Sequence, residues 1–183
     1  MFAYSKSKKG TIILMKIGAI GTSFIMDTIL ENMVVTEGIS CEAIFSRTYE
    51  KGKVLADKFN IDKIYTSLDD MLKDDALDWI YVCSPNSVHY EQSKKALLAG
   101  KHVLCEKPFT TTSQELKELI SIAKEKHLFL FEAILPMFHP NYKLIKENLP
   151  FLQGKEAVFL PCLRRLSLSL SPGSTPKAFL LCG

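Results

Sequence analysis

The chain carries two short stretches whose side chains suit chemistry on a bound ligand. In the first, an acid, an amine and a proline follow one another as Glu106-Lys107-Pro108, directly after a predicted strand. Proline biases the residue before it towards an extended backbone, so this turn can aim the Lys107 ammonium at a substrate hydroxyl. The competing interpretation is an ordinary surface turn, for which this composition is common.

The second stretch, Ser84-Pro85-Asn86, also follows a predicted strand, and His89 comes three residues later. Open α/β folds bind ligands at the carboxyl ends of their strands, so we expect Ser84 and Asn86 to hydrogen-bond a cofactor. Asn86 or Ser87 is the expected cap of the next helix. Neither serine lies in the G-x-S-x-G motif of a hydrolase. For His89 the alternative is a packed or capping histidine without a ligand.

A glycine turn near the N-terminus suits a phosphate. Residues 15–30 have the pattern of a short apolar strand, a tight turn at Gly21 and the first turns of a helix. That order brings backbone N–H groups and the partial positive charge of a helix N-terminus to one point. The dinucleotide motif G-x-G-x-x-G keeps only its first glycine here, with Ser23 and Met26 at the other two positions and an extra Gly18 on the strand.

The two replaced glycines weaken this motif. Ser23 offers a hydroxyl donor, but its Cβ restricts the approach of a phosphate. Met26 is expected to hinder close packing of the helix on the strand. Taken alone, the turn fits an ordinary strand–helix connection as well as it fits a cofactor site.

Ser46 and Arg47 end the second predicted strand, where a dinucleotide fold meets the adenine ribose. A carboxylate at that place favours the free 2′-hydroxyl of NAD, whereas arginine and small polar residues accommodate the 2′-phosphate of NADP. Arg47 can hold a phosphate through two charge-assisted hydrogen bonds, so the sequence favours NADP, with NAD as the alternative. A solvated arginine at the start of the next helix is the competing interpretation.

Six apolar strands alternate with helices along the chain. We expect strands before Gly21 and at residues 39–45, 64–65, 78–82, 102–105 and 128–131, and helices at 24–33, 49–59, 68–72, 89–99, 110–126 and 136–149. Ser67 and Ser113 are the expected caps of two of these helices, and Gly100 closes a third. This alternation predicts an α/β fold with a doubly wound, parallel, Rossmann-like sheet.

The composition argues against several classes of function. The net charge of +3 in 183 residues, with no run of Lys or Arg, argues against a nucleic-acid partner. The five cysteines have no C-x-x-C spacing and the four histidines no metal-ligand spacing, so we expect reduced thiols in a cytoplasmic protein and no metal. No apolar run approaches the roughly 20 residues of a membrane span, so we expect no membrane association.

These motifs together resemble the N-terminal half of the Gfo/Idh/MocA oxidoreductases, because they occur in the family's order and at its spacing. The resemblance covers residues 15–149, about three quarters of the chain. The matching residues are Lys16-Ile17-Gly18, Gly21-Thr22, Ser46-Arg47, Ser84-Pro85-Asn86 with His89, Ala99-Gly100-Lys101-His102-Val103, Glu106-Lys107-Pro108 and Glu132-Ala133.

The resemblance implies a nicotinamide cofactor and a small sugar, cyclitol or dihydrodiol that reacts at a secondary alcohol. It also implies that Lys107 lies beside the nicotinamide and the substrate, which makes it the candidate catalytic residue. The candidate cofactor-binding residues are Gly21, Thr22, Ser23, Phe24, Ile25, Ser46, Arg47, Ser84, Pro85, Asn86, His89, Glu106 and Lys107.

The resemblance also sets the expected domains. We expect residues 1–14 to be an N-terminal extension, residues 15–150 the dinucleotide-binding domain, and residues 151–183 an atypical tail rather than an independent domain. The family's second, antiparallel α+β domain, which completes proton transfer, is then mostly missing, through truncation or a frameshift near residues 152–155; a naturally short paralogue is the alternative. Exposed leucines and cysteines in such a tail would favour a homo-oligomer.

Three functions stay open at this point. The first is NADP-dependent hydride transfer, in which Lys107 orients a hydroxyl and stabilises the developing alkoxide. The second is a catalytically inactive dinucleotide-binding fragment, because the second domain supplies the substrate wall and a dry site in the family. The third is a protein-interaction role for the sheet face that the second domain would cover.

Overall fold

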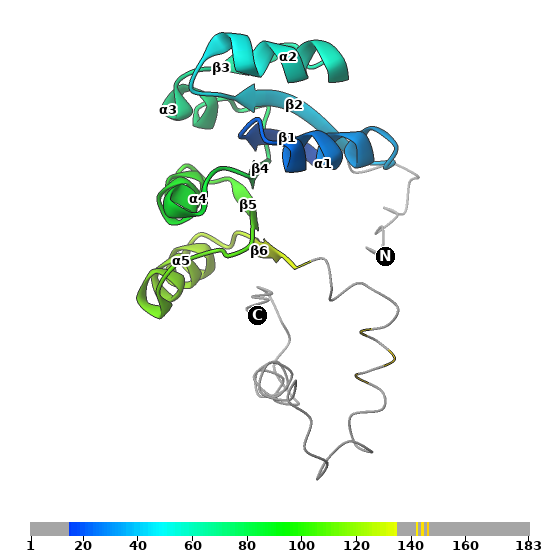
Figure 1. The fold of residues 1–183 in the computed structure, drawn as a ribbon. Helices are drawn as coiled ribbons and strands as arrows, with labels where there is room; N and C mark the ends of the chain where they lie inside the picture. Colours follow the sequence, from blue (N-terminus) through cyan, green and yellow to red (C-terminus); the bar gives the residue numbers. More distant parts are fainter. Residues whose placement is uncertain (1–14, 135–141, 143, 145, 147–183) are drawn as a thin grey trace, which may run out of the picture.

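Six parallel strands form a single sheet in the computed structural model of the chain, which describes residues 15–134 together with 142, 144 and 146 (Figure 1). The spatial order is β3-β2-β1-β4-β5-β6. The strands are β1 (Met15–Ile20), β2 (Ile39–Phe45), β3 (Lys63–Tyr65), β4 (Trp79–Val82), β5 (His102–Glu106) and β6 (Leu130–Ala133). The predicted doubly wound sheet is therefore confirmed.

The strand order reverses between β1 and β4, which lie side by side although the chain passes through β2 and β3 between them. The first half of the sheet is wound outward from β1, and the second half is wound outward from β4. In such sheets ligands bind at the carboxyl edge, in the crevice at this reversal point.

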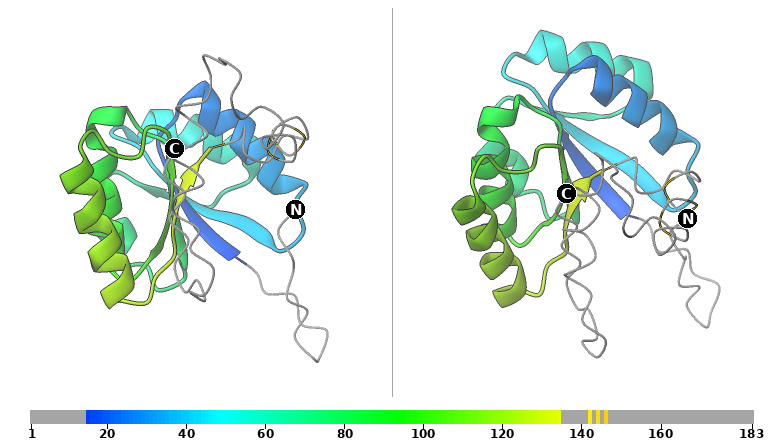
Figure 2. Two further views of the ribbon diagram at one scale, coloured as in Figure 1. Left: turned by 90° about the horizontal axis from the view of Figure 1, so that it is seen from below. Right: turned by 60° about the horizontal axis from the view of Figure 1, so that its bottom comes forward.

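Helices cover both faces of the sheet (Figure 2). Their bounds are α1 (Phe24–Val34), α2 (Tyr49–Phe59), α3 (Leu68–Leu72), α4 (His89–Leu98) and α5 (Ser113–Glu125), with a 3₁₀ turn at Asn86–Val88 before α4. Helices α1 and α2 pack on one face of the sheet and bury residues such as Leu30 and Leu55 there. Helices α3, α4 and α5 pack on the opposite face and bury residues such as Met71, Leu97 and Leu119.

The packing on the two faces of β1 depends on Met26 and Gly18, and for Met26 it differs from the prediction. Met26 does not hinder the packing of α1, because it is fully buried in the core between that helix and the sheet, in a cluster that also holds Ala19. An unbranched, flexible methionine fills an irregular space of this kind. On the other face of β1, a Cβ at Gly18 would lie 2.3 Å from the Met71 terminal methyl, so this glycine lets α3 approach the strand.

The predicted caps of α3 and α4 can be compared with the structure. Ser67 caps α3 by accepting a hydrogen bond from the Asp70 amide, and Gly100 follows α4 in a left-handed conformation with φ of 80°, as expected. The predicted cap of α4 is wrong, because Asn86 and Ser87 lie in the 3₁₀ turn and the residue before α4 is Val88, which makes no side-chain cap.

The start of α5 is also corrected. The helix begins at Ser113 rather than at residue 110, and its cap is Thr112, not Ser113. The Thr112 hydroxyl accepts a hydrogen bond from the Glu115 amide, and the Glu115 carboxylate accepts one from the Thr112 amide. This reciprocal pair is a capping box, which a hydroxyl residue forms only when a Glu or Gln follows it by three positions.

The last strand lies two residues later than predicted. His127 adopts a left-handed conformation with φ of 56°, and the Leu128 amide donates to the Ala123 carbonyl, so Leu128 is used to close the C-terminus of α5 rather than to start a strand. As a result β6 starts at Leu130 and contains Glu132 and Ala133, which were expected to follow the strand.

The predicted extension at residues 1–14, the tail at 151–183 and most of the predicted helix at 136–149 lie outside the described residues. Among the residues that are described, no helix is long and apolar enough to cross a membrane. The same residues hold no group of three His, Cys, Asp or Glu side chains that could bind a metal ion.

Replacing Thr112 by alanine is expected to lower the free energy of unfolding by about 1 kcal/mol, because the capping box loses its hydroxyl acceptor. The measurement is urea unfolding followed by circular dichroism. Ser121→Ala is the matched control, since Ser121 is exposed in the middle of the same helix and alanine favours a helix interior. Equal losses in the two variants would contradict the assignment of this cap.

Candidate functional site

The carboxyl edge of the sheet gathers the loops that carry the predicted site. Because all six strands are parallel, the residues that follow β1, β2, β4 and β5 emerge at the same edge. These residues are Gly21–Ile25 after β1, Ser46 and Arg47 after β2, Ser84–His89 after β4, and Lys107 after β5. The fold therefore brings every candidate stretch of the sequence to one side of the molecule.

Gly21 brings the turn after β1 directly against the end of β4. Its φ is +114°, and a Cβ built on it would lie 2.3 Å from the Cys83 carbonyl oxygen at the end of β4. Its amide donates to the Phe45 carbonyl at 3.1 Å. Any side chain here would push the turn away from β4, so the glycine is required by the fold of this turn.

Ser23 caps the helix that starts from this turn. Its hydroxyl accepts a hydrogen bond from the Met26 amide at 3.4 Å and lies 3.5 Å from the Cys83 sulfur. Burial is the largest cause that raises the pKa of the Cys83 thiol, so the thiol is neutral near pH 7. The amides of Phe24 and Ile25 are first-turn donors that the helix itself does not use.

The end of β2 carries no carboxylate. Ser46 is buried and its amide donates to the Tyr65 carbonyl, whereas Arg47 is exposed. The described residues offer the Arg47 guanidinium no ion-pair partner, so it is open to an anionic ligand. This is the arrangement expected for an adenine ribose that carries a 2′-phosphate.

Side chains of α4 contact the loop after β4. The Ser84 hydroxyl donates to the Gln92 side chain at 2.6 Å. His89 is 1% exposed, and its two ring nitrogens lie within hydrogen-bond distance of the Ser84 and Pro108 carbonyl oxygens. The His89 ring is therefore occupied by the chain, which agrees with the alternative of a packed histidine rather than with a cofactor contact, while Pro85 and Asn86 remain exposed.

Glu106 is the last residue of β5 and is buried, with 8% of its surface exposed. Its carboxylate accepts a hydrogen bond from the Tyr81 hydroxyl at 2.5 Å. Burial, followed by the neighbouring carboxylate, raises the pKa of Tyr81, so this hydroxyl stays a donor at neutral pH. Tyr81 is buried in the core, and it also holds the acid that precedes Lys107.

Lys107 itself is exposed at the start of the β5–α5 loop, and its bond to Pro108 is cis. The described residues offer it no ion-pair partner. Several other lysines of the domain do form ion pairs, including Lys63 with Asp74 at 2.6 Å and Lys94 with Glu118 at 2.6 Å. The Lys107 ammonium is therefore open to a ligand at this edge.

Glu132 is a contributor to this edge that sequence reasoning missed as such. It lies in β6, and its carboxylate accepts a hydrogen bond from the Phe109 amide at 2.9 Å. The signal that could have identified it is a carboxylate at the end of an apolar strand, which is costly to bury without a donor.

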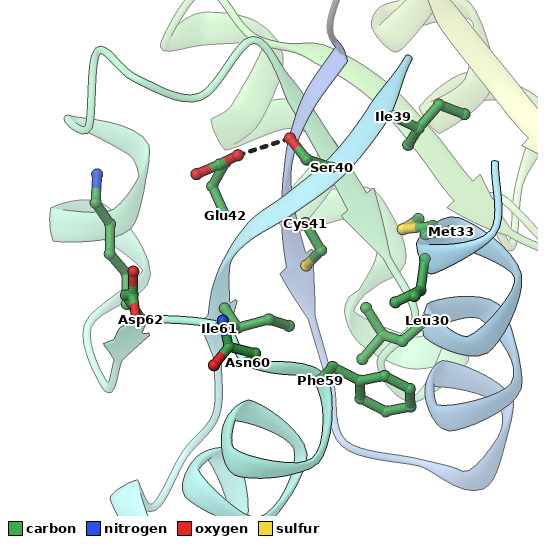
Figure 3. A pocket seen from close by; sticks show the side chains of 12 residues that line it. Leu30, Met33, Ile39, Ser40, Cys41, Glu42, Phe59, Asn60, Ile61 and Asp62 are labelled. Atoms are coloured by element: carbon green, nitrogen blue, oxygen red, sulfur yellow. Dashed lines mark hydrogen bonds between the residues drawn. The ribbon is translucent and has the colours of Figure 1, made fainter. Parts of the chain in front are cut away.

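A cavity of about 360 Å³ lies elsewhere, beside the first residues of β2 (Figure 3). Side chains such as Met33 from α1, Ile39 and Cys41 from β2, and Phe59 from α2 line it. Burial raises the pKa of Cys41 to about 12, so its thiol is not a nucleophile at neutral pH. The cavity opens at the end of β2 opposite to Arg47 and is not part of the candidate site.

The residues at the carboxyl edge fit a dinucleotide. A turn without a Cβ at Gly21 leads into a helix N-terminus, whose free amides suit a pyrophosphate. Exposed cations without ion-pair partners in the described chain, Arg47 and Lys107, flank this turn from the two halves of the sheet.

Comparison with known proteins agrees with this geometry. The model of a family described as an oxidoreductase family with an NAD-binding Rossmann fold matches residues 15–133. The chain belongs to the Gfo/Idh/MocA oxidoreductase family. The resemblance inferred from the sequence motifs is thereby confirmed.

Among curated Gfo/Idh/MocA relatives, the scyllo-inositol 2-dehydrogenase (NADP(+)) IolU of Bacillus subtilis is 38% identical over 136 residues, which are 74% of this chain and 42% of IolU. The trans-1,2-dihydrobenzene-1,2-diol dehydrogenase of Xenopus laevis is 39% identical over 104 residues, 57% of this chain and 32% of that enzyme. The chain spans less than half the length of these relatives.

A solved structure gives the same result for the fold. The 3-ketoreductase KijD10 from Actinomadura kijaniata, in complex with NADP and TDP-benzene, superimposes with a TM-score of 0.71 at 30% identity. The match covers 75% of this chain and 42% of KijD10. The part shared with a Gfo/Idh/MocA enzyme is thus the dinucleotide-binding half.

Replacing Gly21 by alanine is expected to destabilise the domain by more than the roughly 1–3 kcal/mol of a strained backbone conformation, because the new Cβ also meets the Cys83 carbonyl. Urea unfolding measures the loss. Gly100→Ala is the matched control, since Gly100 also has a positive φ but its Cβ would meet nothing within 4 Å. A loss at Gly21 no larger than at Gly100 would contradict the close approach.

Proposed function

We propose that this domain binds NADP across its carboxyl edge and belongs to an oxidoreductase that transfers hydride at a secondary alcohol. The observation that carries the proposal is the set of groups at that edge: the Gly21 turn with the N-terminus of α1, the exposed Arg47, and the exposed Lys107. Each of the three suits a different part of one dinucleotide.

The first half of the sheet would take the adenosine part. The amides at the start of α1 and the helix dipole attract the pyrophosphate. Arg47 offers a planar pair of donors to the 2′-phosphate, which NADP has and NAD lacks. The absence of a carboxylate at Ser46 and Arg47 removes the acceptor that would favour the free 2′-hydroxyl of NAD.

The second half would take the nicotinamide and the alcohol. When bound, a nicotinamide supplies or accepts the hydride. Lys107 would hold the substrate hydroxyl and stabilise negative charge on its oxygen as the C–H bond breaks. Its exposure and its lack of an ion-pair partner in the described chain support this role.

The substrate class follows from the relatives rather than from the edge itself. Relatives named for scyllo-inositol, for a dihydrobenzenediol and for D-xylose all act on molecules with vicinal hydroxyl groups. We therefore assign a polyol, sugar or related diol as the substrate.

The direct test is a titration of the purified chain with NADPH and with NADH, followed by nucleotide fluorescence. We expect saturable binding that is tighter for NADPH. Arg47→Ala is expected to weaken NADPH binding about tenfold or more, because a hydrogen bond to a charged group is worth about 1.5–3 kcal/mol, and to leave NADH binding unchanged.

Lys117→Ala is the matched control for this titration, because Lys117 is also exposed but lies in α5, away from the carboxyl edge. An equal loss of NADH and NADPH affinity in Arg47→Ala would contradict the assignment of the 2′-phosphate to this residue. Absence of binding to either nucleotide in a folded chain would overturn the proposed function.

A second candidate function is dinucleotide binding without turnover. It is supported by the length of the match, since the chain corresponds to 42% of IolU. Incubation with NADP and scyllo-inositol, followed by NADPH absorbance, separates the two functions. If this chain is an active oxidoreductase, we expect NADPH to form and Lys107→Met to abolish its formation without weakening NADP binding more than severalfold. NADP binding with no NADPH formed from any polyol would favour the second function.

A further inference from the structure

The peptide bond between Pro108 and Phe109 is held at both of its polar atoms by side chains from other elements. Its carbonyl oxygen lies 2.9 Å from Nδ1 of His89, the first residue of α4. Its N–H donates to the Glu132 carboxylate of β6 at 2.9 Å. Only Pro108 separates this peptide from Lys107, so whatever fixes the peptide also restrains where the Lys107 backbone lies.

We propose that His89 and Glu132 are positioning residues that clamp this peptide and thereby set the nicotinamide half of the site. The proposal rests on the proposed function for its ligand, while the clamp itself is a property of the free protein. Neither residue needs to touch the cofactor, because both act through the loop that carries Lys107.

The chemistry of His89 suits a clamp better than a ligand contact. Carbonyl oxygens only accept hydrogen bonds, and both ring nitrogens of His89 face carbonyl oxygens, that of Ser84 at 2.8 Å and that of Pro108 at 2.9 Å. The ring lies between the two carbonyls, so it packs the β4–α4 loop against the β5–α5 loop and its N–H donates to one of them. At 1% exposure it is shielded from water, which would otherwise compete for this hydrogen bond.

Glu132 completes the clamp from the opposite side. Amides next to a turn often bond to solvent, but the Phe109 amide has a carboxylate acceptor, and the Phe109 side chain is 3% exposed in the core. A hydrogen bond to a charged acceptor is shorter and stronger than one between neutral groups. The Lys107 loop is consequently anchored to β6 as well as to α4.

The position of the clamp predicts which half of the dinucleotide it affects. The clamped loop follows β5, in the half of the sheet wound outward from β4, whereas Gly21 and Arg47 belong to the half wound outward from β1. The two halves of such a sheet each receive one mononucleotide. Loosening the clamp should thus weaken the binding of the nicotinamide part of the ligand and leave the binding of the adenosine part unchanged.

The first measurement is amide hydrogen exchange of the free, full chain. His89→Leu and Glu132→Leu are expected to speed exchange at the Phe109 amide about tenfold or more, because a buried, bonded amide becomes able to open. Leu97→Val is the matched control: Leu97 is buried two turns further along α4, so its loss of packing lowers stability without releasing the loop. Unchanged exchange at Phe109 in both clamp variants, or an equal increase in Leu97→Val, would overturn the proposal.

The second measurement compares NADPH with adenosine 2′,5′-bisphosphate, which keeps the 2′-phosphate and lacks the nicotinamide. His89→Leu is expected to weaken the binding of NADPH about fivefold and to leave the affinity for the bisphosphate unchanged. His89→Asn places an amide donor near the position of Nδ1, retains the bond to Pro108, and should restore most of the affinity. Equal weakening of both ligands, with no rescue by asparagine, would reduce His89 to a structural residue and overturn its positioning role.

These readouts separate the two proposals. If the unaltered chain binds neither ligand, the proposed function fails, and the exchange at Phe109 still decides whether the clamp exists. If the unaltered chain binds both ligands and His89→Leu changes only the exchange, the clamp stands but its influence on the nicotinamide half is overturned.

Discussion

The close contact between Gly21 and the end of β4 is the constraint on which the site depends. β1 and β4 are neighbours at the point where the strand order reverses, so the turn after β1 must lie directly against the Cys83 carbonyl. Only a residue without a Cβ fits there, because the imagined atom lies 2.3 Å from that oxygen. With the turn seated, α1 begins at the carboxyl edge, and its unpaired first-turn amides face the loops of the second half. A displaced turn would leave those loops without an anion site beside them.

The two halves of the edge are stabilised by different means. In the first half the site is formed mainly by the backbone, through the Gly21 turn and the N-terminus of α1. In the second half buried polar side chains hold the loops: Tyr81 donates to Glu106, His89 contacts Pro108, and Glu132 accepts from Phe109. Polar groups are costly to bury unless they are paired, and these are paired with each other or with the backbone. The loop that carries Lys107 is therefore ordered before any ligand arrives, which lowers the entropy lost on binding.

From the sequence, the helices and strands of this domain could be predicted better than the contacts between their side chains. The apolar runs and the turn residues between them are local features, so the alternation of strands and helices, the helix at residue 49 and the cap at Ser67 followed from them. The α5 cap could not be chosen from four neighbouring hydroxyl residues, at positions 110–113, without locating the Glu three positions after Thr112. The partners of His89 lie 5 and 19 residues away, and periodicity carries no information about such pairs. The sequence therefore left both a cofactor contact and a packed histidine open for His89, and only its contacts show that the ring lies between two loops.

The altered glycine motif changes how a pyrophosphate would be held rather than whether it is held. The Ser23 hydroxyl oxygen accepts the cap hydrogen bond from the Met26 amide, and the hydroxyl lies 3.5 Å from the Cys83 sulfur, so the side chain is held against α1 and the end of β4. The Cβ of Ser23 keeps the ligand further from the backbone than a glycine would. Helix-dipole attraction weakens over such a gap and is screened by salt. A larger share of the binding free energy must then come from the cations at the edge. Arg47 and Lys107 can supply it, because the described chain leaves both without ion-pair partners.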